Sequence, residues 1–193
     1  YGDYPINKLP YKEHYPLKAQ FPYDTSKACA DMIALSYSRN LFNLPVIITR
    51  FSNIYGPGQL NFTALIPEAI RACILNKRLI MRSNGKAIRD FVYIDDIVEL
   101  YKLLSMNLYL KPKKFSGQVF NVGTNKKHQV KDILNKIYSF ANKKKELRSL
   151  NKQMLKRKTS GEISIQFMDF KKVNKYLNWK PKHQFEEKVL VLF

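Results

Sequence analysis

A tyrosine and a lysine four residues apart are the side chains best suited to chemistry. They belong to Tyr23-Asp24-Thr25-Ser26-Lys27, near the start of a predicted helix, so both are expected on one helical face. A phenol titrates near about pH 10 and is a poor base at neutrality, but a neighbouring ammonium lowers its pKa. Such a pair can take a proton from a hydroxyl group while hydride leaves the same carbon. The spacing also occurs by chance. In the alternative without chemistry, Tyr23 packs at the start of the helix and Lys27 is only a surface charge.

The elements around this pair alternate between helix and strand. Apolar spacing predicts helices, and short β-branched or apolar runs predict buried strands. The predicted order is loop 1–21, helix 22–42, strand 46–48, helix 64–77, strand-turn-strand 79–94, helix 97–107 with an aspartate cap, strand 117–124, amphipathic helix 127–144 and a solvated helix or flexible connection 143–160. This order predicts an α/β fold with a parallel sheet. Two clearly buried strands are too few for a doubly wound sheet, so we expect part of a longer protein.

Composition and charge limit the classes of binding partner that the chain is expected to have. The chain has 34 Lys and Arg against 15 Asp and Glu, a net charge of +19. Lys dominates, whereas base-specific contacts favour the planar fork of Arg, so we interpret the charge as compositional bias and expect no nucleic-acid partner. It would still attract a diphosphate. No apolar run reaches the roughly 18 residues that a membrane span needs, and we expect no membrane partner.

The cysteines and histidines suggest neither a disulfide framework nor a metal site. Cys29 and Cys73 lack C-x-x-C spacing, which fits a reducing cytoplasm. His14, His128 and His183 are scattered without metal-ligand spacing.

Several ordered motifs together resemble the extended short-chain dehydrogenases/reductases, the NAD-dependent epimerase/dehydratase family. They are Tyr1-Gly2, PYDTSKACADMIALSYSRNL, VIITRFSNIYGPGQ, NGKAIRDFVYIDDIVELY, VFNVGT and KYLNWKP, and they cover residues 1–183. Within the family, IYGPGQLNFTALIPEAIRA and RSNGKAIRDFVY look most like CDP-glucose 4,6-dehydratases.

The resemblance implies an incomplete Rossmann-like parallel sheet with a small α/β substrate-binding lobe. Residues 1–60 and 88–124 would form the C-terminal part of the NAD-binding domain, and residues 61–87 and 125–193 the lobe. A likeness to this family also implies a homodimer, in which the Ala28, Met32, Leu35 side of the helix could face a second subunit or the sheet.

Site residues follow from the same resemblance. Tyr23 would be the acid/base, and Lys27 would also hold the nicotinamide ribose of NAD. A nucleotide-diphosphate sugar would be bound by Asn53, Leu65, Ile66, Arg71, Arg82, Arg89 and Asn121. Two alternatives stay open: Asn53 could cap its own turn, and Arg89 could pair with Asp90 or Asp96.

Two family features do not occur in this sequence. The glycine-rich dinucleotide fingerprint is absent, and so are the polar residues that the family places before its Y-G. We therefore expect this chain alone to bind NAD poorly and to be inactive. The expected activity is 4,6-dehydration of a nucleotide sugar such as CDP-glucose, with 4-epimerisation or reduction as the alternative. A non-catalytic nucleotide-sugar-binding fragment is the alternative from another class.

Overall fold

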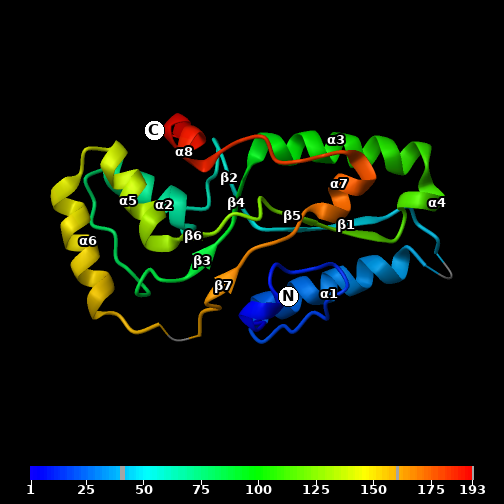
Figure 1. Cartoon of the computed structure of the whole chain (residues 1–193), viewed down its shortest axis with the longest axis horizontal. Coiled ribbons are helices and arrows are strands. Elements are labelled where there is room, and N and C mark those ends of the chain that lie inside the picture. Colours follow the sequence, from blue (N-terminus) through cyan, green and yellow to red (C-terminus); the bar gives the residue numbers. More distant parts are fainter. Residues whose placement is uncertain (40–41, 160, 193) are drawn as a thin grey trace.

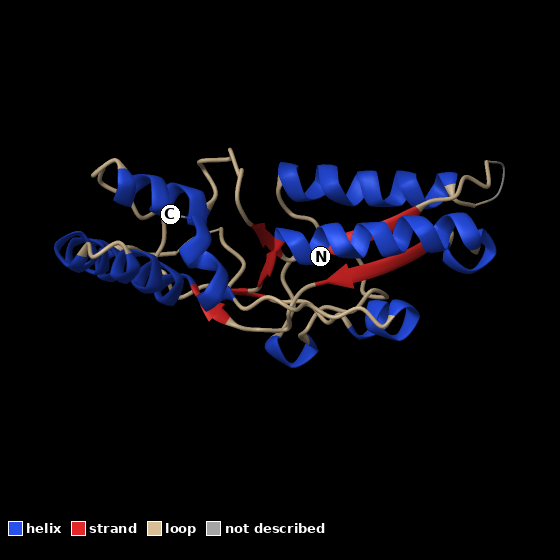
Figure 2. Ribbon diagram, turned by 90° about the horizontal axis from the view of Figure 1, so that it is seen from above, coloured by secondary structure: helices blue, strands red, loops and turns tan. Residues whose placement is uncertain are grey.

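Short strands run through the middle of the molecule, with helices at both ends (Figures 1 and 2). The computed structural model describes residues 1–39, 42–159 and 161–192. The helices are η1 Ile6–Lys8, α1 Pro22–Tyr37, α2 Leu65–Ile74, α3 Ile94–Leu110, α4 Pro112–Phe115, α5 Val130–Phe140, α6 Lys144–Lys156, α7 Lys171–Leu177, α8 Phe185–Lys188 and η2 Val189–Leu192. The strands are β1 Ile47–Phe51, β2 Asn53–Tyr55, β3 Ile88–Arg89, β4 Phe91–Tyr93, β5 Gln118–Val122, β6 His128–Gln129 and β7 Ile165–Gln166.

The strand pairing is mainly parallel. β1 runs parallel to β5, with Thr49 opposite Phe120, and β2 runs parallel to β4. In a third sheet of order β6-β3-β7, β3 is antiparallel to β6 and parallel to β7. The prediction of an α/β fold with parallel strands is confirmed.

Two apolar cores hold these elements together. The sheet core joins α3, α7 and β5 through buried residues that include Val92, Leu100, Phe120, Val122, Val173 and Trp179. The lobe core joins α2, α5, α6 and α8 through buried residues that include Ala69, Ile70, Ile133, Leu134, Leu150 and Phe185. Burial of such side chains is the main favourable term in folding, so each core keeps its own elements together.

The amphipathic helix at 127–144 is confirmed as α5. Its predicted apolar face is buried at every position: Val130, Ile133, Leu134, Ile137 and Tyr138. The stretch 143–160 contains a helix, α6, which buries Leu150 and Met154 against the lobe core. The basic residues of α6 stay on its other side because only one stripe of an amphipathic helix can pack.

Several local predictions are wrong. The first helix ends at Tyr37 and not near Phe42, and Asn43 beyond it has a positive φ of 47°. The predicted strand-turn-strand over 79–94 does not form a hairpin. Residues 79–82 form no strand, and the second predicted strand is divided into β3, which pairs with β6 and β7, and β4, which pairs with β2. The hydrogen bonds that would close a hairpin are thus taken by distant segments.

Asp96 and Trp179 also lie elsewhere than predicted. Asp96 is fully buried and does not cap α3; its carboxylate accepts hydrogen bonds from the backbone N–H groups of Lys182 and His183. Trp179, expected in the small lobe, packs in the sheet core, and its indole N–H donates to the Asp96 carbonyl at 3.2 Å. The division into two domains at the predicted boundaries stays a prediction.

Candidate active site

Helix α1 presents Tyr23 and Lys27 side by side. Pro22 occupies its first turn, where a missing N–H costs nothing, and Asp24 follows where the helix dipole favours negative charge. The Lys27 Nζ lies 5.4 Å from the centroid of the Tyr23 ring. Tyr23 is 71% exposed, so its hydroxyl group is accessible to a ligand.

Both side chains line a cavity of about 560 Å³, here called the α1 cavity. Its wall comes from α1, from β1 and from the N-terminal segment, including Tyr1, Asp31 and Arg50. The cavity is large enough for part of a dinucleotide or a sugar ring. The predicted acid/base pair therefore lies together, at the edge of a cavity.

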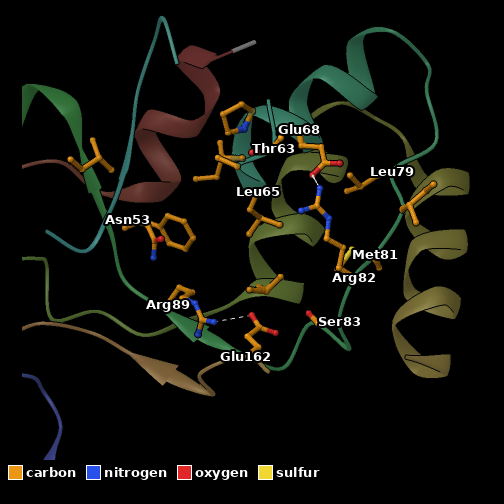
Figure 3. Close-up of a pocket in the computed structure, with 17 residues that line it drawn as sticks. Asn53, Thr63, Leu65, Glu68, Leu79, Met81, Arg82, Ser83, Arg89 and Glu162 are labelled. Atoms are coloured by element: carbon orange, nitrogen blue, oxygen red, sulfur yellow. Dashed lines mark hydrogen bonds and ion pairs between the residues drawn. The ribbon is translucent and has the colours of Figure 1, made fainter. Parts of the chain in front are cut away.

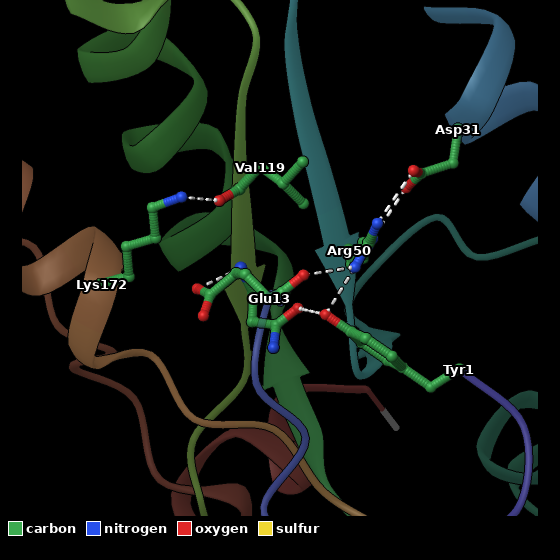
Figure 4. A network of polar contacts seen from close by, with 7 residues as sticks. Tyr1, Glu13, Asp31, Arg50, Val119 and Lys172 are labelled. Atoms are coloured by element: carbon green, nitrogen blue, oxygen red, sulfur yellow. Dashed lines mark hydrogen bonds and ion pairs between the residues drawn. The ribbon is translucent and has the colours of Figure 1, made fainter. Parts of the chain in front are cut away.

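A polar network forms the inner wall of this cavity (Figure 4). Arg50 of β1 donates from Nε and Nη2 to the two carboxylate oxygens of Asp31, at 2.7 and 2.9 Å. Its Nη1 donates to the Tyr1 hydroxyl at 2.9 Å and to the Glu13 carbonyl at 3.1 Å. Burial alone would lower the pKa of Arg50, but the hydrogen bonds that it donates to Asp31 and Tyr1 outweigh this effect and raise the pKa.

Asn121 belongs to the same network and does not line the α1 cavity. It is fully buried; its side chain accepts a hydrogen bond from the Tyr1 hydroxyl and donates to the Tyr11 carbonyl at 2.9 Å. Burial is the largest cause of the raised pKa of Tyr1. In this conformation Asn121 ties the N-terminal segment to β5, and its predicted contact with substrate has no support from the geometry.

A second cavity, of about 270 Å³, lies between the strands and the lobe and is here called the lobe cavity (Figure 3). Five of the seven predicted substrate-binding residues line it: Asn53, Leu65, Ile66, Arg82 and Arg89. Leu65 and Ile66 come from the start of α2, and the amide of Asn53 donates to the Asp90 carbonyl at 3.1 Å. Its lining combines apolar walls with a few convergent polar groups, which is typical of a small-molecule site.

Two ion pairs place cationic groups around the lobe cavity. The Arg89 guanidinium donates to Glu162 at 2.8 Å, so its partner is neither Asp90 nor Asp96. Burial lowers the pKa of Arg89, and the Glu162 charge partly offsets this effect. Arg82 lies 3.9 Å from Glu68 in a largely exposed pair, which is a weak interaction.

Arg71 lines neither cavity. Its guanidinium stacks over the Phe62 ring at 4.6 Å and lines an apolar groove that adjoins the lobe cavity at Pro67. A cation over an aromatic face is a stabilising contact in its own right. The predicted contact of Arg71 with substrate therefore stays a prediction that this geometry does not support.

Sequence reasoning missed three residues of these sites: Asp31, Arg50 and Glu162. Asp31 follows Lys27 by one helical turn, and Arg50 is a charge inside an apolar strand, which was an available signal. Glu162 had no such signal, because it approaches Arg89 from 73 residues away.

The described residues contain neither a candidate metal-binding cluster nor a helix suited to span a membrane. Within residues 1–39, 42–159 and 161–192, no group of three or more His, Cys, Asp or Glu side chains is arranged to hold a metal ion. No helix in those ranges is both long and apolar enough to cross a membrane.

Known proteins of similar sequence are enzymes of nucleotide-sugar metabolism. A dTDP-D-glucose 4,6-dehydratase of Dictyostelium discoideum is 38% identical over 120 residues, which is 62% of this chain and 26% of that protein. A trifunctional UDP-glucose 4,6-dehydratase/UDP-4-keto-6-deoxy-D-glucose 3,5-epimerase/UDP-4-keto-L-rhamnose-reductase of Arabidopsis thaliana is 30% identical over 166 residues, or 86% of this chain and 23% of that protein. The chain thus spans about a quarter of the length of these relatives.

The solved structures that resemble this chain also include a nucleotide-sugar dehydratase. The dTDP-glucose 4,6-dehydratase of Bacillus anthracis, crystallised with NAD, superposes with a TM-score of 0.80 at 29% identity, over 98% of this chain and 56% of that one. This similarity confirms the Rossmann-like fold class. That a cofactor-binding half is missing from this chain stays a prediction. The GDP-mannose 4,6 dehydratase family matches residues 1–190, so the chain belongs to that family, among the extended short-chain dehydrogenases/reductases of the epimerase/dehydratase type.

Proposed function

We propose that the protein is an NAD-dependent nucleotide-sugar 4,6-dehydratase that acts on CDP-glucose or a similar nucleoside-diphosphate hexose. The observation that carries the proposal is the Lys27 ammonium 5.4 Å from the Tyr23 ring at the edge of the α1 cavity. A protein that only bound a ligand would not require a phenol and an ammonium in this arrangement. The names of the similar proteins support the reaction class.

Tyr23 is the proposed acid/base. Its hydroxyl would take the proton of the sugar 4-hydroxyl as hydride leaves C4, and would return a proton later in the cycle. Lys27 would place its positive charge beside the Tyr23 ring, where it can stabilise negative charge that develops on the phenol during the proton transfer. Oxidation at C4 makes the neighbouring C5 proton acidic, so water can then be lost across C5 and C6 before hydride is added at C6.

The same pair fits the nicotinamide ribose of NAD. The Lys27 ammonium can donate to ribose hydroxyls, and both side chains are exposed where a ring could approach them. Bound NAD would supply the hydride acceptor and donor. Tyr23 and Lys27 would orient that end of the cofactor against the sugar.

The lobe cavity is the proposed binding site for the nucleoside diphosphate. Leu65 and Ile66 offer an apolar wall for the base, and Arg89 offers a planar fork that suits a diphosphate. Asn53 lies on the strand side of the same cavity. Arg82 is more exposed and would contribute charge.

Product analysis tests this proposal. The full-length protein is incubated with NAD and CDP-, dTDP- or UDP-glucose, and the products are identified by mass spectrometry and NMR. The proposal predicts a 4-keto-6-deoxy sugar that has lost one water molecule. Unchanged substrate with every nucleotide would reject the enzymatic assignment.

A 4-epimerase or reductase is the second candidate. A putative UDP-glucose 4-epimerase of Methanocaldococcus jannaschii is 27% identical over 183 residues, or 94% of this chain and 55% of that protein. The same Tyr and Lys pair serves both reactions, because each begins with oxidation at C4. A 4-epimeric product of unchanged mass would favour this candidate.

A non-catalytic binding fragment is the third candidate. It predicts that calorimetry on residues 1–193 detects a nucleotide sugar but no NAD, and that the full-length protein does not turn over.

We also propose a cytoplasmic homodimer that has neither nucleic acid nor membrane as a partner. The exposed Met32 side of α1 is consistent with a second subunit on that face. Light scattering on the full-length protein would measure the oligomeric state, and DNA binding that falls steeply with salt would contradict the exclusion of nucleic acid.

A further inference from the structure

Helix α1 has little apolar burial against the rest of this chain. None of its residues is fully buried, and Met32 and Ile33 are 57% and 56% exposed; Ala28, Ala34 and Leu35 are half-buried. Helices are normally fixed by a packed apolar stripe, and α5 in the lobe is an example. Polar contacts therefore have a larger share in positioning the helix that carries Tyr23 and Lys27.

The ion pair between Asp31 and Arg50 provides that connection. In the described part of the chain, its two hydrogen bonds are the only ones between α1 and a strand. The two side chains are 10% and 13% exposed, and the contact uses both carboxylate oxygens. A bidentate contact fixes distance and orientation together, which a single hydrogen bond does not.

The spacing along α1 transmits this constraint to the acid/base pair. Asp31 follows Lys27 by four residues and Tyr23 by eight, so the three side chains lie along one side of the helix. All three line the α1 cavity. A shift of Asp31 relative to β1 would therefore move Tyr23 and Lys27 relative to that cavity.

Arg50 is itself held on its other side. Its Nη1 donates to the Tyr1 hydroxyl and to the Glu13 carbonyl, and the Glu13 carboxylate accepts from the Asn121 backbone N–H at 2.9 Å. The guanidinium is thereby linked to β1, to β5 and to the N-terminal segment. These contacts hold the Arg50 guanidinium in one position, to which the ion pair then attaches the helix.

We propose that Arg50 and Asp31 are positioning residues, which act on the reaction by setting the place of Tyr23 and Lys27 in the α1 cavity. This inference rests on the proposed function, because positioning matters only if Tyr23 moves a proton. Misplacement of a catalytic group by about 1 Å can reduce turnover about 100-fold.

The test is Arg50→Lys in the full-length protein. Lysine keeps the positive charge but cannot form the two parallel hydrogen bonds to Asp31. We expect kcat to fall about 10- to 100-fold with less than about a threefold change in KM for the sugar nucleotide, since the lobe cavity is not altered. A lower melting temperature with an unchanged kcat would overturn the inference, because it would show a purely structural role.

Tyr23→Phe separates this inference from the proposed function. If Tyr23→Phe keeps near-normal turnover, or the wild type forms no product, the proposed function is wrong and the positioning role falls with it. If Tyr23→Phe removes turnover and Arg50→Lys does not, only the positioning role is wrong. In the Tyr23→Phe background, Arg50→Lys should lower the residual rate by less than about threefold, since residues that act as a unit are not additive.

Glu99→Gln is the matched control. It breaks an exposed ion pair, to Lys182, on the other face of the sheet core. It should leave kcat and KM unchanged. Amide hydrogen exchange over residues 22–37 tests the inference without measuring turnover. Arg50→Lys should accelerate exchange in this helix. Unchanged exchange would contradict the proposal that the Arg50–Asp31 ion pair fixes the helix.

Discussion

The α1 cavity and the lobe cavity are built in opposite ways. Tyr23 and Lys27 stand on a helix without a buried side chain, and a polar network attaches that helix to β1. The lobe cavity is supported by α2 and α5, whose inner faces are buried in the lobe core. The acid/base pair depends on a few directional contacts, whereas the binding residues depend on many non-directional ones.

This difference shows how stability and chemistry can be divided within one fold. A change in the α1 cavity should alter turnover with little effect on folding. A change in the lobe core should alter folding first and binding as a consequence. Variants on the two sides of the molecule should separate these two effects.

The largest effect is expected for Tyr23→Phe. It removes one hydroxyl group from a side chain that is 71% exposed, so the melting temperature should not change. Loss of a general acid/base should reduce kcat by about 10² to 10⁴, measured by product formation under saturating substrate. A tenfold or smaller loss would contradict the proposed role.

Ile133→Ala should have the largest effect on stability. Ile133 is fully buried in the lobe core, and such truncations cost about 2–5 kcal/mol. Denaturant unfolding would measure the loss. Leu155→Ala, at a residue that is 88% exposed on α6, is the control and should change stability by less than about 0.5 kcal/mol.

Arg89→Lys should weaken binding of the sugar nucleotide. Lysine keeps the charge but not the fork that matches a diphosphate, so we expect Kd to rise about tenfold in calorimetry. Lys86→Arg, at an exposed position close by in sequence, is a control that should leave Kd unchanged. An equal affinity of the Arg89→Lys variant would place the diphosphate elsewhere.

The smallest effect is expected from pH. Burial, followed by the charges of Lys136 and Lys126, lowers the pKa of His128 below its ordinary 6.5, although Glu186 opposes this. The unfolded chain then binds the proton more readily than the folded one. Stability should therefore fall as the pH drops below about 6.5, by less than about 1.4 kcal/mol per pH unit for this group.

His128→Gln tests the assignment of that pH dependence. The variant should show a shallower loss of stability between pH 6.5 and 5, and an unchanged slope would assign the dependence to other groups. This pH effect belongs to the lobe side, because His128 meets the Phe91 ring edge-on and lies tilted against Phe185 of the lobe core.

Local patterns in the sequence predicted most of the fold. The apolar stripe of α5 and the β-branched run that begins β1 identified their elements, because burial follows periodicity. The hairpin predicted over 79–94 is wrong because residues 79–82 form no strand and β3 pairs with a segment 77 residues away, a choice that no local signal encodes. The prediction that Trp179 packs in the small lobe was wrong for the same reason, because the sheet core in which it packs includes residues of α3 and β5.

The site could be predicted where a motif carries it. Tyr23 and Lys27 were found from spacing and resemblance, and both line one cavity. Asp31 and Arg50 were not found, because an ion pair between a helix and a strand leaves no periodic trace. Asn121 shows a limit of prediction from resemblance. A residue that matches a family motif can still face the interior of the protein and not a ligand.

Deuterium transfer within the sugar reveals whether the reaction begins with oxidation at C4 and ends with hydride at C6. The full-length protein is given the glucose nucleotide that it converts, carrying deuterium at C4, and the product is examined by NMR. If Tyr23 and Lys27 drive oxidation at C4 in a 4,6-dehydratase, the deuterium should appear at C6 of a 4-keto-6-deoxy product. Deuterium that remains at C4, or returns to C4 of an epimerised sugar, would contradict the account.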